Sequence, residues 1–417
     1  MSDDRCQRSE VRKAPFLFRH LTSDIRHLFS GPWRAVLVLC VTQILAWGAI
    51  YYPPVLTVPL IAADRGWSAT LAMGGFSFGL LVAGVAAPRV GALIDRYGGH
   101  RVMPAGSLVG ALGLVGLVHA GHPAAYFAVW MALGLSMSAS LYDPAFATLG
   151  RVFGAAARRP ITALTLAGGF ASTVSWPATH ALIGAVGWRG TYLIYAALLA
   201  LIAAPLHAFV LPRTRASVET RPGGVPAPVA PVPPTGLAFA LVAAAFAAYA
   251  FVPSGLAAHL LAIFGRLGLE PATVVAIGTL FGPAQVAARL TEFVFGRDLH
   301  PLWLVRGAVG LLVLGFLLLW AFGLSVPVAI AFAVMFGVAN GLVTIARGTV
   351  PLALFGPTGY GRIVGRIAGP SLLMQAAAPL LLAYVAEHAS DRAALAVAAA
   401  FAVIALACFV AVRRPGV

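Results

Sequence analysis

Four ionisable residues lie inside stretches that are otherwise apolar: Asp143, Arg289, Glu292 and Arg347. A charge at the centre of a membrane helix costs about 2.5–3.5 kcal/mol on insertion scales, so each needs a partner, a cavity or a function. The two acids and two arginines carry no net charge when all are ionised, which favours pairing. Groups of these types can also bind an anionic solute or carry a proton.

Arg289 and Glu292 are three positions apart on one predicted helix, where such neighbours can neutralise each other. One interpretation is therefore a local ion pair near the end of that helix. The alternative makes Arg289 an anion contact and Glu292 part of a gate. Gln285 lies on the same stripe of the helix and would join that second arrangement.

Neutral candidates for a solute site are spread over several predicted helices. They are polar or amphipathic enough to touch a solute, although Tyr and Trp also serve packing and interfacial roles in membrane helices. The candidates are Gln43, Trp47, Tyr51, Tyr52, Ser172, Trp176, Asn340, Thr344 and Gln375. No histidine in the spans has a second ligand at metal-binding spacing, and no nucleotide loop or H-E-x-x-H motif occurs. We therefore predict no metal, no cofactor and no enzyme.

The composition explains why these charges are unusual. The chain is 60% hydrophobic and 10% charged, whereas roughly a quarter of the residues in a soluble domain are charged. Water cannot be its main solvent. The net charge of +15 could suggest nucleic acid as a partner, but the arginines gather in alternate connections between apolar runs. By the positive-inside rule this pattern predicts a multi-pass protein of a bacterial-type inner membrane with both termini cytoplasmic.

Each span needs about 20 apolar residues to cross the hydrocarbon core. The sequence predicts an all-α membrane protein with twelve such helices, in two pseudo-symmetric halves of six. The first six are expected near 35–62, 69–90, 102–120, 124–149, 161–186 and 192–210. The second six are expected near 236–264, 273–296, 303–323, 327–350, 367–387 and 391–412.

The predicted domains follow from these spans. They are a cytoplasmic N-terminal segment 1–32, a six-helix bundle 33–211, a cytoplasmic Pro/Gly-rich linker 212–235, a second six-helix bundle 236–412 and a cytoplasmic tail 413–417. Pro53 and Pro253 recur in the first span of each half, which indicates a duplicated unit.

The segment GALIDRYGGHR at 91–101 joins the second and third predicted spans. It resembles the signature loop of the major facilitator superfamily, G-x-L-x-D-R-x-G-x-x-R. Glycines such as Gly91 and Gly98 permit a tight turn, and Asp95 can cap a helix or pair with an arginine. Arg96 and Arg101 can anchor at anionic headgroups. We expect a cytoplasmic gating loop.

Two further segments, RRPITALTLAGG at 158–169 and GWR at 187–189, resemble monocarboxylate-porter-type members of the same superfamily. The lysine of the first span and the Asp/Arg pair of the eighth, expected in the well-known monocarboxylate carriers, have no plain counterparts here. The eighth span instead carries Arg289 and Glu292, so the resemblance does not transfer a substrate.

The resemblance implies that spans one, four, seven and ten line a central cavity and that the halves are related by an axis along the membrane normal. Asp143 and Arg347 are 204 positions apart, close to the repeat offset, and should then face each other. Protonation of Asp143 would release Arg347 for an anionic substrate; the alternative is a permanent locking bridge.

These features predict a secondary active transporter that works by alternating access as a monomer. The favoured cargo is a small organic anion moved together with protons. The alternatives are efflux of drugs or metalloids and, in another class, a receptor or channel without a transport cycle. The expected partners are a small solute, protons and the lipid bilayer, with no nucleic acid.

Overall fold

The structure of the chain is a computed structural model that describes residues 31–213, 236–296 and 299–413. Every regular element within these ranges is a helix. The predicted all-helical architecture is therefore confirmed for the described part of the chain. The predicted N-terminal segment, linker and C-terminal tail lie outside the described residues except at their edges.

The helices fall into two consecutive sets. The first set is α2 (Trp33–Ala46), η1 (Trp47–Tyr51), α3 (Pro54–Arg65), α4 (Ala69–Tyr97), α5 (Gly99–His119), α6 (Pro123–Ser140), α7 (Tyr142–Phe153), η2 (Gly154–Ala157), α8 (Arg158–Gly168), α9 (Ala171–Leu198), η3 (Leu199–Ala203) and η4 (Leu206–Val210). The second set is α10 (Leu237–Arg266), α11 (Pro271–Thr279), α12 (Phe281–Phe295), α13 (Pro301–Phe322), α14 (Val326–Phe355), α15 (Tyr360–His388) and α16 (Asp391–Ala411).

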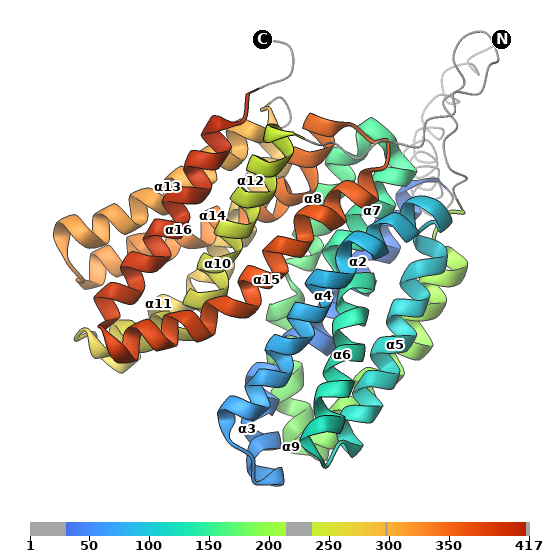
Figure 1. Cartoon of the computed structure of the whole chain (residues 1–417), viewed down its shortest axis with the longest axis horizontal. Coiled ribbons are helices and arrows are strands. Elements are labelled where there is room, and N and C mark those ends of the chain that lie inside the picture. Colours follow the sequence, from blue (N-terminus) through green and yellow to red (C-terminus); the bar gives the residue numbers. More distant parts are fainter. Residues whose placement is uncertain (1–30, 214–235, 297–298, 414–417) are drawn as a thin grey trace, which may run out of the picture.

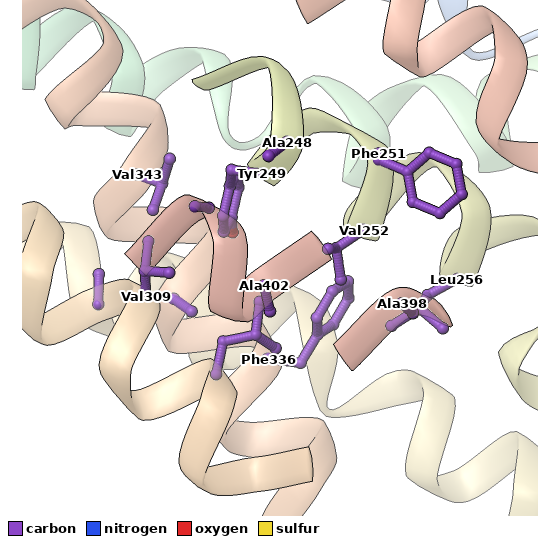
Figure 2. Packing of buried hydrophobic residues seen from close by; sticks show 14 of the residues in the cluster. Ala248, Tyr249, Phe251, Val252, Leu256, Val309, Phe336, Val343, Ala398 and Ala402 are labelled. Carbon is purple, nitrogen blue, oxygen red and sulfur yellow. The ribbon is translucent and has the colours of Figure 1, made fainter. Parts of the chain in front are cut away.

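The two sets form two bundles that meet along α4 and α15 and diverge towards α3 and α11 (Figure 1). The core of the second bundle is built from apolar side chains of α10, α13, α14 and α16, as Figure 2 shows for Tyr249, Val309, Phe336 and Ala402. The Tyr249 hydroxyl is buried there with no hydrogen-bond partner among the described residues. Each bundle therefore has its own apolar core.

Glycines allow α4 and α15 to pack with their backbones in contact. A side chain at Gly91 would collide with the carbonyl of Gly361, and one at Gly365 would collide with that of Ala87. Small residues do this in membrane proteins because lipid supplies no hydrophobic drive for helix association. The connection predicted at 91–101 is shorter than expected: residues up to Tyr97 continue α4, Gly98, with φ of 82°, makes the turn, and α5 begins at Gly99.

Among the described residues, ten helical stretches are long and apolar enough to cross a membrane. One of them, Pro123–Val210, has 88 residues, about four times the length that the hydrocarbon core requires. It is interrupted at Leu141 and at two glycines with positive φ, Gly154 and Gly187. The predicted count of twelve spans is neither reproduced nor excluded by these stretches.

Each bundle has one ion pair at the end where the bundles diverge, and we call these the rim ion pairs. Arg189 donates to both carboxylate oxygens of Asp64, at 3.0 and 2.6 Å. Arg266 donates to both oxygens of Asp391, at 2.9 and 2.6 Å. Asp64 and Arg266 are 202 positions apart, as are Arg189 and Asp391. The same contact therefore recurs in both bundles with acid and base exchanged.

Candidate solute-binding site

Asp143 and Arg347 form an ion pair between the two bundles. Asp143 lies in the first turn of α7, where the helix dipole stabilises a carboxylate. Nη2 of Arg347, on α14, is 2.7 Å from Oδ2 of Asp143, and both side chains are largely buried. The ion pair predicted from the repeat offset is therefore formed; its role in moving a solute or a proton stays a prediction.

A cavity of about 20 Å³ adjoins this ion pair, which is room for about one water molecule. Trp47, Tyr51 and Gln375 line it together with the pair. Oδ1 of Asp143 and Nε of Arg347 are buried and have no hydrogen-bond partner within the described chain. The pair thus keeps one unused acceptor and one unused donor beside a space that water can fill.

Arg289, on α12, is buried and held by neutral acceptors. Its Nη1 donates at 2.9 Å to the carbonyl of Thr165, in the last turn of α8, which also accepts from the backbone N–H of Gly169. Its Nε donates to the carbonyl of Gly341, and its Nη2 to Oε1 of Gln285 and Oγ1 of Thr344, each at 3.4 Å. Gln285 was expected beside Arg289, and the structure places it there.

Glu292 does not pair with Arg289, so the predicted local ion pair is wrong. Glu292 Oε1 lies 3.1 Å from Nη2 of Arg158, on α8 of the other bundle. The same nitrogen donates to the carbonyl of Gly296, at the C-terminal end of α12, at 2.6 Å. Arg289 and Glu292 are about 60° apart around α12, near enough to pair, but each side chain instead reaches a partner on another helix.

Arg158 changes the charge balance of the centre. Three guanidinium groups, those of Arg158, Arg289 and Arg347, now accompany the two carboxylates of Asp143 and Glu292. Each carboxylate has one arginine partner. Arg289 is therefore the guanidinium that has no carboxylate partner among the described residues, and one buried positive charge remains.

Gln43 and Trp47 are linked in a fixed arrangement. Gln43 is fully buried and donates from Nε2 to the carbonyl of Ser140 at 2.7 Å. Its Oε1 accepts a hydrogen bond from Nε1 of Trp47 at 3.1 Å. Gln43 therefore orients the indole of Trp47 instead of facing a cavity itself.

Trp47 belongs to a group of five ring side chains of the first bundle, which we call the aromatic wall: Trp47, Tyr51, Tyr52, Tyr142 and Trp176. Ring centroids are 4.7 Å apart for Trp47 and Tyr51, and 5.1 Å for Trp47 and Tyr142. Tyr52 continues the wall to Trp176 at 6.2 Å. Sequence reasoning missed Tyr142, although it precedes Asp143 directly.

The remaining candidates lie around the aromatic wall, the Asp143–Arg347 ion pair and Arg289. Ser172 lies next to the hydroxyl of Tyr52. The carbonyl of Asn340 accepts a hydrogen bond from Thr344 at 2.7 Å. The carbonyl of Gln375 accepts one from Ser254 at 2.7 Å, while the residue lines the cavity beside Arg347. The structure thus brings the predicted residues of both bundles to one region.

The signature segment lies at the end where the bundles are in contact. Oδ1 and Oδ2 of Asp95 accept hydrogen bonds from the backbone N–H groups of Gly361 and Arg362, at 2.8 and 2.7 Å. A carboxylate in this place caps the N-terminus of α15 and complements its dipole. Arg96 and Arg101 are exposed. Helix capping, one of the two predicted roles for Asp95, is therefore observed.

Comparison with known proteins places these features in a family. The model of the Major Facilitator Superfamily matches residues 7–158 and 38–300. Human monocarboxylate transporter 11 is 32% identical over 173 residues, which are 40% of this chain and 32% of that protein. The chain thus spans about a third of the length of this curated relative.

Solved structures share the fold at low sequence identity. The human organic anion transporter MFSD10 (TETRAN) superposes with a TM-score of 0.70 at 19% identity, over 91% of this chain and 99% of its own. The proton:xylose symporter XylE gives 0.67 at 12% identity, over 92% and 96%. FucP, in its outward conformation, gives 0.67 at 11% identity, over 91% and 99%. With the family model matching well over half of its length, this multi-pass membrane protein belongs to the Major Facilitator Superfamily, a family of transporters.

Proposed function

We propose that the protein is a secondary active transporter that moves a small organic anion by alternating access, coupled to protons. The observation that carries the proposal is Arg289, a buried guanidinium with neutral acceptors only among the described residues. A buried charge without a counter-ion is unfavourable. A carboxylate cargo would supply the missing negative charge, whereas a cationic cargo would add to the excess.

Asp143 is the residue we assign to proton coupling. Its Oδ1 has no partner within the described chain and lies beside the cavity of about 20 Å³. A proton arriving there through water would bond to Oδ1 and neutralise the carboxylate. Arg347 would then lose its counter-ion and become a second site for the anion, so the binding of proton and anion would favour each other.

We further propose that this arrangement is the outward-facing state. The inter-bundle contacts of Asp95, Arg158 and Arg289 lie at or near the end where α4 and α15 pack together. The rim ion pairs at the opposite end each lie within one bundle. The positive-inside pattern predicts that the contact end is cytoplasmic.

The twelve-span topology belongs to the same proposal. The 88-residue stretch Pro123–Val210 would cross the membrane three times, with changes of direction at Gly154 and Gly187. Together with the other nine stretches this gives twelve spans in two halves of six. The termini would lie on the cytoplasmic side of an inner membrane, and the monomer would be the working unit.

A ligand screen on the purified full-length protein tests the nature of the cargo. We expect monocarboxylates at millimolar concentration to raise the midpoint of thermal unfolding, because binding to the folded state stabilises it by mass action. Matched amines and lipophilic cations should leave it unchanged. Stabilisation by lipophilic cations or by metalloid oxyanions, with no effect of carboxylates, would contradict organic-anion transport and favour efflux of toxic compounds.

Asp95→Ala is expected to slow the transport cycle without preventing insertion. Loss of a helix cap costs about 1 kcal/mol, which would shift the balance between the two orientations by about fivefold. Uptake by proteoliposomes, normalised to the reconstituted protein, should fall several-fold. Ser68→Ala is the matched control, because it removes a helix cap, that of α4, that lies within one bundle. Equal turnover of Asp95→Ala and the native protein would contradict the role of the cap.

A further inference from the structure

We propose that the transported anion is an aromatic monocarboxylate, with its ring on the aromatic wall and its carboxylate towards the arginines of the second bundle. The inference rests on the proposed function and adds a substrate class to it. It follows from a difference between the two bundles. The first bundle presents the aromatic rings of the wall, and the second presents the guanidinium groups of Arg289 and Arg347 and the amide of Gln375.

The first bundle supplies a continuous surface of rings. Tyr51 and Tyr52 are 5.5 Å apart between centroids, and Trp47 contacts both. Three members of the wall, Trp47, Tyr51 and Tyr142, line the cavity beside the ion pair. Trp176 lies at the other end of the wall with 48% of its surface exposed. The aromatic wall therefore extends from the half-exposed ring of Trp176 to the ion pair of Asp143 and Arg347.

The second bundle supplies polar groups opposite this wall. Arg347 and Gln375 line the same cavity as Trp47 and Tyr51. Arg289, on α12, lies within electrostatic range of Tyr52 and Tyr142 of the wall. Arg289 and Arg347 therefore belong to the second bundle and the rings to the first, and a solute that satisfies both must be amphipathic, with one anionic end and one flat apolar body.

The wall is fixed before any solute binds. Trp47 is held by the buried Gln43, which is itself bound to the carbonyl of Ser140. The N–H of Tyr52 donates to the carbonyl of Trp47 at 3.1 Å, five residues back, so the chain forms a π-type turn here. Such turns are frequent at functional sites. A preformed ring surface favours rigid planar ligands, because little side-chain freedom is lost on binding.

Smaller or more polar anions fit this surface poorly. An acid with two or three carbons would leave most of the wall without a partner, and a polyhydroxylated solute would set its hydroxyl groups against rings. Aromatic pairs in edge-to-face or offset geometry are worth about 0.5–1.5 kcal/mol beyond the area that they bury. A benzene ring is therefore the most suitable body for the carboxylate.

Binding of four probes to the purified full chain tests the inference: benzoate, cyclohexanecarboxylate, lactate and benzylammonium. Benzoate should bind most tightly, about threefold to tenfold tighter than cyclohexanecarboxylate, and benzylammonium should not bind. Trp176→Leu should remove most of the difference between the two six-membered rings, and Trp176→Phe should retain it. Trp320→Leu, at an exposed tryptophan on α13, is the control and should change nothing.

The outcomes separate this inference from the proposed function. If lactate binds as tightly as benzoate and Trp176→Leu affects neither, the cargo is still an anion but the aromatic preference is wrong. If no carboxylate binds, organic-anion transport itself is wrong. If benzylammonium binds and benzoate does not, the wall serves a cation, and both proposals fail.

Discussion

Arg289→Gln is expected to lower kcat/KM for carboxylate uptake by about one to two orders of magnitude. Hydrogen bonds to charged groups contribute about 1.5–3 kcal/mol, and each 1.4 kcal/mol is about a factor of ten in affinity. Glutamine can still donate to the carbonyl of Thr165 but removes the unmatched positive charge. The loss should appear mainly as a higher KM in proteoliposome uptake, because the charge is proposed to bind the anion.

Two further variants make the Arg289 experiment decisive. Arg289→Lys keeps the charge and should recover part of the affinity, although lysine lacks the planar donor pair that matches a carboxylate. Arg392→Gln, at an exposed arginine of α16, controls for the loss of one positive charge from the protein. An Arg289→Gln protein that takes up carboxylates with native KM would refute the assignment of the anion site.

Asp143→Asn is expected to abolish proton-driven accumulation while leaving solute exchange intact. Asparagine keeps the size of the side chain but cannot take up and release a proton. With one proton per solute, an inward gradient of one pH unit supports about tenfold accumulation in the native protein. The variant should reach a ratio of about one, while counterflow of labelled solute continues because that exchange requires no net proton movement.

The Asp143 experiment has an equally direct control. Glu387→Gln removes an exposed carboxylate of α15 to which no role in transport is assigned, and should keep accumulation near the native value. If Asp143→Asn still concentrates solute against its gradient, another group carries the proton. If it loses exchange as well as accumulation, the pair with Arg347 is a structural bridge that transport cannot do without.

The sequence could predict the Asp143–Arg347 pair because two global patterns agree on it. Charge balance demands partners for buried ions, and the repeat offset places these two residues at related positions. Arg158 escaped the same reasoning, since it was assigned to a connection before a span starting at 161. Composition defines helix ends poorly. Arg158 is the first residue of α8, and from there its side chain reaches Glu292 on α12.

The signature segment shows the limit of local interpretation. Its glycines predict a turn, yet Gly91 lies within α4, where a side chain would collide with the backbone of α15. The predicted ion pair between Arg289 and Glu292 is absent for a similar reason, since partners on α8 compete with the helical neighbour. Local propensity cannot anticipate such contacts, because the competing groups come from more than 100 residues away in sequence.

The exchanged polarity of the rim ion pairs would favour closure of this end in the proposed transport cycle. An axis along the membrane normal would bring Asp64 and Arg266, which occupy equivalent positions in the two bundles, towards each other as this end narrows. A faithful copy of the first half would have placed aspartate opposite aspartate, with mutual repulsion. With acid and base interchanged, opposite charges face each other, and the two bundles would approach here without that repulsion.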